Sequence, residues 1–329
     1  MKLAIYSITY AGIWYNGRAL SVEEIIERAA RFGYEGVEID GKRPHGFPLD
    51  WSPERRKAVR ALAERKGVEI VAVSANNNFT SPIPEEREAQ MLMVVELIKL
   101  ARDLGAKIVR IFAAWPGVTI GEDGRAAYDI ARCEWYRPPS TYLQRWRWCR
   151  DCIKEVARIA EKEKIILCLQ NHKPLIRNYR DMIDMVREVG SDYVKCCLDA
   201  PLLDNQEDSY VINAVKETGN LQVLSHFGGE FVKTPDGKIT QKVSADLKWV
   251  NYEAFLRALK DIGYEGFLSY ELCHPFLPEG HEYGTLDQVD EQVMMANQYM
   301  RELLQKIESK EVMPGTGEKN RATLAKTVS

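Results

Sequence analysis

The chain has 329 residues, a formal net charge of −3 and a charged fraction of 28%. This balance provides no basic surface for nucleic acid, and no apolar run approaches the ~18 residues that a membrane span requires. The first residues, MKLAIYSITYAG, become polar too early for a signal peptide and fit a first strand better.

Short apolar segments alternate with amphipathic segments along most of the chain. The segments predicted as strands are Leu3–Ile8, Gly36–Asp40, Glu69–Ser74, Ile108–Ala113, Ile165–Gln170, Val194–Asp199, Leu221–His226 and Phe267–Glu271. Helical periodicity covers 22–32, 53–66, 85–104, 140–163, 179–189, 208–218, 252–262 and 285–306. Eight such pairs predict an α/β protein with one (β/α)8 TIM-barrel domain over residues 1–306. Residues 307–329 lack apolar periodicity and are expected to form a flexible or partner-bound tail.

Two local signals support these boundaries. Ser21 and Glu24 have the spacing of a capping box, which marks the start of a helix. The tetrapeptide GYEG occurs twice, and its first glycine, Gly33 or Gly263, suits the left-handed position that ends a helix.

A long loop at 115–139 follows the fourth predicted strand and contains Trp115 and Trp135. Long loops in compact domains are often lids, and aromatic faces there would suit a sugar ring. The alternative, that these aromatic residues pack an additional helix on the barrel, is equally consistent with the sequence.

Four neighbouring predicted strands end on side chains that can bind a metal ion. These side chains are Gln170, Asp199, His226 and Glu271. A single aspartate or histidine at a strand end is weak evidence, since it usually caps a helix or packs in the core. Four in register at one rim predict a divalent ion, with Mn²⁺ favoured and Mg²⁺ or Co²⁺ as alternatives.

The chain resembles the xylose-isomerase-like TIM-barrel superfamily, in the branch of sugar phosphate isomerases and epimerases. The resemblance rests on GYEGVEI, LQNH, LDAP, LSHFGG and YELCH and covers roughly residues 1–306. It implies an ion held by Glu, Asp, His and Glu, which fall on Gln170, Asp199, His226 and Glu271. The first position departs from this pattern, and Leu202 stands where the epimerases tend to carry a histidine.

The amide of Gln170 limits the chemistry of the site. It can bind an ion through its carbonyl oxygen, but it cannot take or give a proton. Ketose epimerases use two carboxylates on opposite faces of the substrate, so this scheme lacks one member. Strand alternation places His172 on the same side as Gln170, and we predict His172 as the base with Glu271 as its partner. The alternative is that His172 only lines the pocket.

Several further residues are candidates for binding the substrate. They are Glu38, Asn76, Arg110, Trp115, Trp135 and Lys173. Strand alternation points Glu38 into the barrel, where it could bind sugar hydroxyls or form an ion pair with Arg110.

The leading functional hypothesis is a metal-dependent sugar isomerase or epimerase that removes a proton next to a carbonyl. The alternative is a lyase that dehydrates a keto-inositol or cleaves a 3-keto-glycoside, as carbon-glycoside deglycosidases do. A lyase needs one base only, so Gln170 harms it less. A sugar-binding protein without activity is disfavoured by the three retained ligand types, and an endonuclease by the five histidines.

Seven cysteines, mostly in apolar stretches, favour reduced thiols in a cytoplasmic protein. Cys149 and Cys152 form a CxxC pair inside a predicted helix, where core packing is the default interpretation. We expect a homo-oligomer with a small-molecule sugar substrate and with no nucleic-acid or membrane partner.

Overall fold

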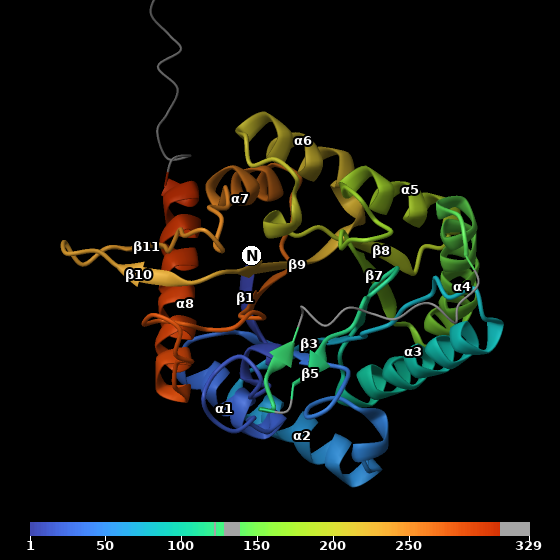
Figure 1. Cartoon of the computed structure of the whole chain (residues 1–329), viewed down its shortest axis with the longest axis horizontal. Coiled ribbons are helices and arrows are strands. Elements are labelled where there is room, and N and C mark those ends of the chain that lie inside the picture. Colours follow the sequence, from blue (N-terminus) through green and yellow to red (C-terminus); the bar gives the residue numbers. More distant parts are fainter. Residues whose placement is uncertain (122, 128–138, 310–329) are drawn as a thin grey trace, which may run out of the picture.

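Eight parallel strands close into a barrel in this computed structural model, which describes residues 1–121, 123–127 and 139–309 (Figure 1). The closed order is β1-β12-β9-β8-β7-β4-β3-β2. The strands are β1 Lys2–Tyr6, β2 Gly36–Asp40, β3 Glu69–Ser74, β4 Ile108–Ile111, β7 Ile166–Gln170, β8 Val194–Cys197, β9 Gln222–Gly228 and β12 Phe267–Glu271. The predicted TIM barrel is therefore confirmed.

In the described part of the chain, eight α-helices surround the barrel and alternate with its strands (Figure 1). They are α1 Val22–Arg31, α2 Pro53–Lys66, α3 Pro84–Leu104, α4 Tyr142–Glu163, α5 Tyr179–Val189, α6 Asp208–Thr218, α7 Tyr252–Asp261 and α8 Leu286–Ser309. The last helix extends three residues beyond its predicted end, and the rest of the predicted tail lies outside the described residues. No described helix is long and apolar enough to cross a membrane.

The local signals act as the sequence predicts. The Ser21 side chain accepts from the backbone of Glu24, and the Glu24 side chain accepts from the backbone of Ser21. This reciprocal pair satisfies two backbone donors at the start of α1. Gly33 and Gly263 have φ angles of +76° and +74°, which residues with a Cβ rarely adopt.

The interior of the barrel is a separate small apolar layer. It consists of Ala4, Val71, Ala72, Cys168, Cys197, Leu224 and Phe267. The larger hydrophobic core lies between the strands and the surrounding helices. Because the inner layer fills the barrel below the carboxyl ends of the strands, polar side chains can gather only above it.

Two insertions carry short antiparallel pairs that the sequence analysis did not predict. Strands β5 Thr119–Ile120 and β6 Ala126–Ala127 pair within the long loop after β4. Strands β10 Phe231–Lys233 and β11 Ile239–Gln241 pair after β9, and they extend beside α8 (Figure 1). Short 3₁₀ helices occupy Ser7–Tyr10, Pro48–Asp50, Ala200–Leu202 and Gly219–Leu221.

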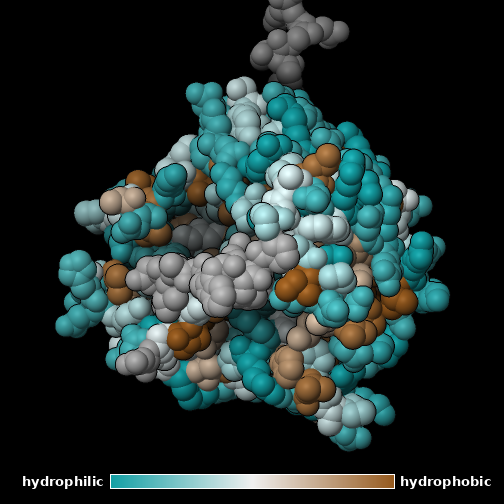
Figure 2. Space-filling view, turned by 45° about the vertical axis from the view of Figure 1, so that its right-hand side comes forward, coloured by the Kyte–Doolittle hydropathy of each residue, from teal (hydrophilic) through white to brown (hydrophobic). Residues whose placement is uncertain are grey.

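The surface in Figure 2 is mainly hydrophilic, and its hydrophobic residues form small separate groups. Exposed large hydrophobic side chains belong to several elements and include Leu49, Leu92, Val243 and Trp249. Single exposed hydrophobic residues of this kind are normal for a globular surface.

The loop after β2 contains a buried histidine whose charge state affects stability. His45 is 1% exposed, and its Nε2 lies 3.2 Å from the carbonyl oxygen of Leu20. Burial lowers the pKa of His45 from 6.5 to about 4, although Asp40 acts in the opposite direction. Between pH 4 and pH 6.5, His45 is therefore mainly protonated in the unfolded chain and mainly neutral in the folded chain. The stability that depends on neutral His45 is present above pH 6.5 and is lost as the pH falls towards 4.

We expect His45→Gln to remove this dependence. The free energy of unfolding of the parent minus that of the variant should fall by about 2 kcal/mol between pH 7 and pH 5. Urea unfolding of both proteins at both pH values measures this quantity, and titrating groups common to both proteins cancel in the difference. A difference that does not change with pH would show that folding does not lower the pKa of His45.

Candidate metal centre and proton-transfer site

Three neighbouring strands bring Gln170, Asp199 and His226 together at the carboxyl end of the barrel. Gln170 is the last residue of β7, Asp199 follows the end of β8, and His226 lies in β9. The Gln170 amide Nε2 donates to Asp199 Oδ2 and lies 3.1 Å from His226 Nδ1. His226 Nδ1 lies 2.9 Å from Asp199 Oδ2, and all three residues are buried. The structure thus joins three of the four residues predicted to bind metal.

Hydrogen bonds to both its backbone and its side chain fix the position of Asp199. The backbone N–H of His226 donates to Asp199 Oδ1 at 2.7 Å. Asn171, the residue after β7, accepts from the Asp199 N–H at 2.9 Å and donates its amide to the Asp199 carbonyl at 3.3 Å. These bonds fix the carboxylate before any ligand arrives.

His226 lies between two carboxylates. Its Nε2 is 2.9 Å from Glu38 Oε2, on the side of the ring opposite to Asp199. Burial alone would lower the pKa of His226, but Asp199 and Glu38 raise it well above its usual value. Burial would likewise raise the pKa of Glu38, whereas His226 lowers it below its usual range. The Ser74 hydroxyl also donates to Glu38, so this carboxylate contacts protein groups and orients the imidazole.

We expect Glu38→Gln to weaken metal binding without removing a ligand. The neutral amide should hold His226 less firmly, and affinity for a divalent ion should drop about 10–100-fold. Isothermal titration calorimetry with Zn²⁺ or Mn²⁺ measures the change. Glu35→Gln, an exchange near the amino end of β2, is the matched control and should leave the affinity unaltered. Equal affinities in Glu38→Gln and the parent would rule out the positioning role.

A second polar network occupies the ends of β1 to β4. Arg110 is 2% exposed, donates to the Tyr6 hydroxyl at 2.7 Å and lies 4.0 Å from Glu38 Oε1. Tyr6 in turn donates to Asp40 Oδ1 at 3.1 Å, and the partly exposed Asn76 donates to the same oxygen at 2.6 Å. Of the predicted substrate-binding residues in this network, Asn76 is the more accessible and Arg110 is enclosed.

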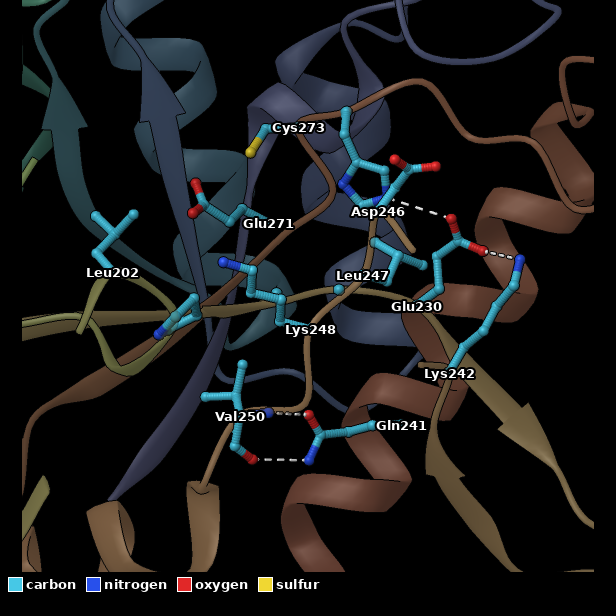
Figure 3. A pocket seen from close by; sticks show the side chains of 14 residues that line it. Leu202, Glu230, Gln241, Lys242, Asp246, Leu247, Lys248, Val250, Glu271 and Cys273 are labelled. Carbon is cyan, nitrogen blue, oxygen red and sulfur yellow. Dashed lines mark hydrogen bonds and ion pairs between the residues drawn. The ribbon is translucent and has the colours of Figure 1, made fainter. Parts of the chain in front are cut away.

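Glu271, the last residue of β12, lines a pocket of about 300 Å³ together with Leu202, Lys248 and Cys273 (Figure 3). Burial raises the pKa of Glu271 above its usual value. A Cβ at Gly228, its register partner in β9, would lie 3.4 Å from Glu271 Cγ and 2.8 Å from its carbonyl oxygen. The glycine therefore leaves room for this side chain.

The other wall of the pocket comes from the insertion after β9. Buried Glu230 binds Lys242 Nζ at 2.7 Å and lies 3.3 Å from His274 Nε2. The Gln241 side chain forms hydrogen bonds with the backbone N–H and carbonyl of Val250, and these bonds hold the segment between β11 and α7 against the hairpin (Figure 3). These contacts attach the hairpin beside Glu271 and give the pocket charged groups of both signs.

His172 lies beyond the end of β7 and packs against aromatic rings. Its ring centroid is 4.9 Å from that of Phe112 and 5.0 Å from that of Trp115. Its Nδ1 lies 2.5 Å from the Lys173 carbonyl, and burial lowers its pKa. Within the described residues no hydrogen bond joins His172 to Gln170. Strand β7 ends at Gln170, so strand alternation does not fix the direction of the His172 side chain. Lys173 is exposed and binds Asp204 at 2.8 Å.

Trp115 stacks on Phe112, with ring centroids 4.7 Å apart. Trp135, the other aromatic residue predicted to bind a sugar, lies outside the described residues. The predicted lid role of the long loop at 115–139 therefore stays a prediction.

The residues present fit a divalent cation. Gln170 Oε1 is a buried oxygen without a hydrogen-bond partner in the described part of the chain, as expected of an atom that awaits a ligand. Cys197 adds a sulfur that the sequence analysis did not consider. Cys197, Asp199 and His226 are the one group among the described residues with three or more such ligand atoms within 4.8 Å of one another.

Sequence comparison identifies the family of the chain. A family profile described as xylose isomerase-like TIM barrel matches residues 26–293. The chain belongs to the xylose isomerase-like TIM-barrel family.

Three proteins similar to this chain illustrate the family. D-psicose 3-epimerase of Ruminiclostridium cellulolyticum is 25% identical over 289 residues, which cover 84% of this chain and 85% of the relative. Fructoselysine 3-epimerase of Escherichia coli O157:H7 is 23% identical and covers 80% and 90%. A crystal structure of IOLI protein with a binding zinc atom has a TM-score of 0.65 at 17% identity, over 93% of this chain and 99% of that one. The last likeness shows the shared barrel fold.

Proposed function

We propose that this protein is a divalent-cation-dependent sugar epimerase or isomerase that removes a proton from the carbon next to a carbonyl. One observation carries the proposal. Buried Asp199 and His226 meet the amide of Gln170 at the carboxyl ends of neighbouring strands, where a TIM barrel places its chemistry, and the oxygen of this amide has no hydrogen-bond partner among the described residues.

The comparisons support a sugar substrate and a metal ion. Two relatives are named as 3-epimerases of sugars or sugar derivatives, and one structural neighbour is described with zinc. We assign the ion to Asp199, His226 and Gln170, and the predicted ligand role of Glu271 stays a prediction. A bound cation supplies Lewis acidity that polarises the substrate carbonyl and stabilises negative charge on its oxygen.

We assign the proton transfer to Glu271. Its carboxylate faces the pocket, and a raised pKa makes it a stronger base than an ordinary glutamate once it is ionised. The carboxylate takes the proton from carbon, the C–H electron pair forms a carbon–carbon double bond, and the carbonyl becomes an enolate. Return of a proton to either face restores the carbonyl and gives the starting sugar or its epimer.

His172 is the candidate for the second face. It follows β7, whereas Glu271 ends β12, and strands β8 and β9 with the metal cluster lie between them. The Nδ1 contact with the Lys173 carbonyl leaves Nε2 as the nitrogen that can exchange a proton. Phe112 and Trp115 form an aromatic wall beside it, which suits the apolar face of a sugar ring.

Replacing His172 by alanine is expected to lower kcat on the order of 10²–10⁴-fold, the usual contribution of a positioned acid or base. Metal content should stay at the level of the parent, because no proposed ligand is removed. Steady-state kinetics with metal analysis of the same sample tests this expectation. An active variant would reduce His172 to part of the pocket wall.

Elimination is the second candidate function, and Gln170 favours it. With a neutral amide at this position the two-carboxylate scheme lacks a member, whereas elimination needs only one base, here Glu271, and a leaving group. Incubation of the metal-loaded protein with unphosphorylated ketohexoses and with a 3-keto-glycoside distinguishes the two reactions. An epimer or isomer supports the proposal, whereas an unsaturated sugar with a released aglycone supports the lyase.

A further inference from the structure

We propose that Cys197 is a thiolate ligand of the metal centre and that it shifts the preference of the centre from Mn²⁺ and Mg²⁺ towards Zn²⁺ and Co²⁺. This inference rests on the metal centre of the proposed function. Cys197 is the last residue of β8 and lies two positions before Asp199, so both side chains face the barrel interior.

The position of the sulfur distinguishes Cys197 from an ordinary core cysteine. Its Sγ lies 3.4 Å from Asp199 Oδ1 and 4.0 Å from His226 Nδ1. Asp199 Oδ2 is 2.9 Å from the same imidazole nitrogen. Zinc with bonds of about 2.0–2.3 Å to N, O and S requires ligand atoms roughly 3.3–3.5 Å apart, and the observed spacings bracket this range.

The orphaned oxygen of Gln170 independently points to a ligand at this place. Gln170 is 3% exposed, and its Oε1 has no hydrogen-bond partner among the described residues. Its Nε2 is directed at Asp199 and His226. Rotation of the amide plane would present the oxygen to these groups instead, and a cation between them would stabilise that arrangement.

The thiolate also offsets the charge lost at Gln170. Compared with the Glu-Asp-His-Glu set that the family resemblance implies, Gln170 removes one negative charge, and a Cys197 thiolate restores one. The two sets differ in softness, however. Sulfur ligands select Zn²⁺ and other borderline ions, whereas carboxylates suit Mn²⁺ and Mg²⁺.

Cobalt substitution provides a direct test. Metal-free full-length protein is titrated with Co²⁺ and followed by absorption spectroscopy, since thiolate ligation produces an intense near-ultraviolet charge-transfer band. We expect this band in the parent and its loss in Cys197→Ser. Cys168→Ser is the matched control, because Cys168 belongs to the same inner layer but not to the ligand group, and this variant should keep the band.

Competition between Zn²⁺ and Mn²⁺ gives a second readout. The ratio of their affinities should fall at least about tenfold in Cys197→Ser. The double variant Cys197→Ser with Gln170→Glu should recover affinity for Mn²⁺, since it restores the charge, but not the band. If Cys197→Ser does not fold, the parent and Cys168→Ser are compared instead. The band in both proteins supports the inference, and its absence from both contradicts it.

The outcomes separate this inference from the proposed function. Stoichiometric Co²⁺ binding without the band would overturn the thiolate ligand and leave the metal centre intact. Failure to bind Co²⁺ in equilibrium dialysis would overturn the metal centre itself. A band that disappears in Cys168→Ser but persists in Cys197→Ser would show that Cys168, and not Cys197, is the sulfur ligand, and it would overturn the inference.

Discussion

Replacing Asp199 by asparagine is expected to abolish divalent metal binding and to lower kcat/KM on the order of 10³-fold or more, because a Lewis acid supplies several kcal/mol to the transition state. Asp199 accepts bonds from the Gln170 amide and from both the backbone and the ring of His226. Its loss therefore removes the one carboxylate at the centre of the cluster.

Elemental analysis and steady-state kinetics on the same preparations test this prediction. Asp184→Asn, an exchange on the exposed side of α5, is the matched control and should retain both metal and activity. An Asp199→Asn protein with full metal occupancy would place the ion elsewhere in the molecule.

Glu271→Gln should have the second large effect, with loss of turnover on the order of 10²–10⁴-fold. The amide preserves the shape of the side chain but cannot accept a proton from carbon. In the parent, activity should rise with pH as Glu271 ionises, and the raised pKa moves this rise above the range of an ordinary glutamate. Removal of the carboxylate should eliminate this acid limb.

The pH profile of kcat distinguishes a chemical role from a structural one. Glu265→Gln, on the exposed turn before β12, provides the control and should leave both the rate and the profile unchanged. Equal turnover in Glu271→Gln and the parent would exclude Glu271 as the base.

The barrel could be predicted because its signals are local and repeated. Each strand is a short apolar run, and each amphipathic helix supplies the cover that a parallel strand needs. Strand ends shifted by a few residues, as at β1, because 3₁₀ turns continue the apolar pattern after the ladder stops. The β10–β11 hairpin has a recognisable turn at Asp236–Gly237, but strands of three residues carry too little periodicity to detect alone.

The side-chain partners could be predicted only in part. Strand alternation gives the direction of Glu38 but not its partner, which comes from β9, far away in the sequence. His172 lies past the last ladder residue, where alternation no longer fixes direction. The sequence does not indicate Cys197 as a ligand, because a cysteine in an apolar strand is typical of the hydrophobic core. Only the fold shows that its sulfur lies close to Asp199.

The most direct test follows solvent deuterium into the carbon next to the carbonyl of unphosphorylated ketohexoses by proton NMR. We expect exchange in the metal-loaded parent, no exchange after chelation, and recovery when a divalent ion is added back. We also expect no exchange in Asp199→Asn or Glu271→Gln. Exchange that continues unchanged in the chelated protein, or in both variants, would contradict metal-assisted proton removal at this site.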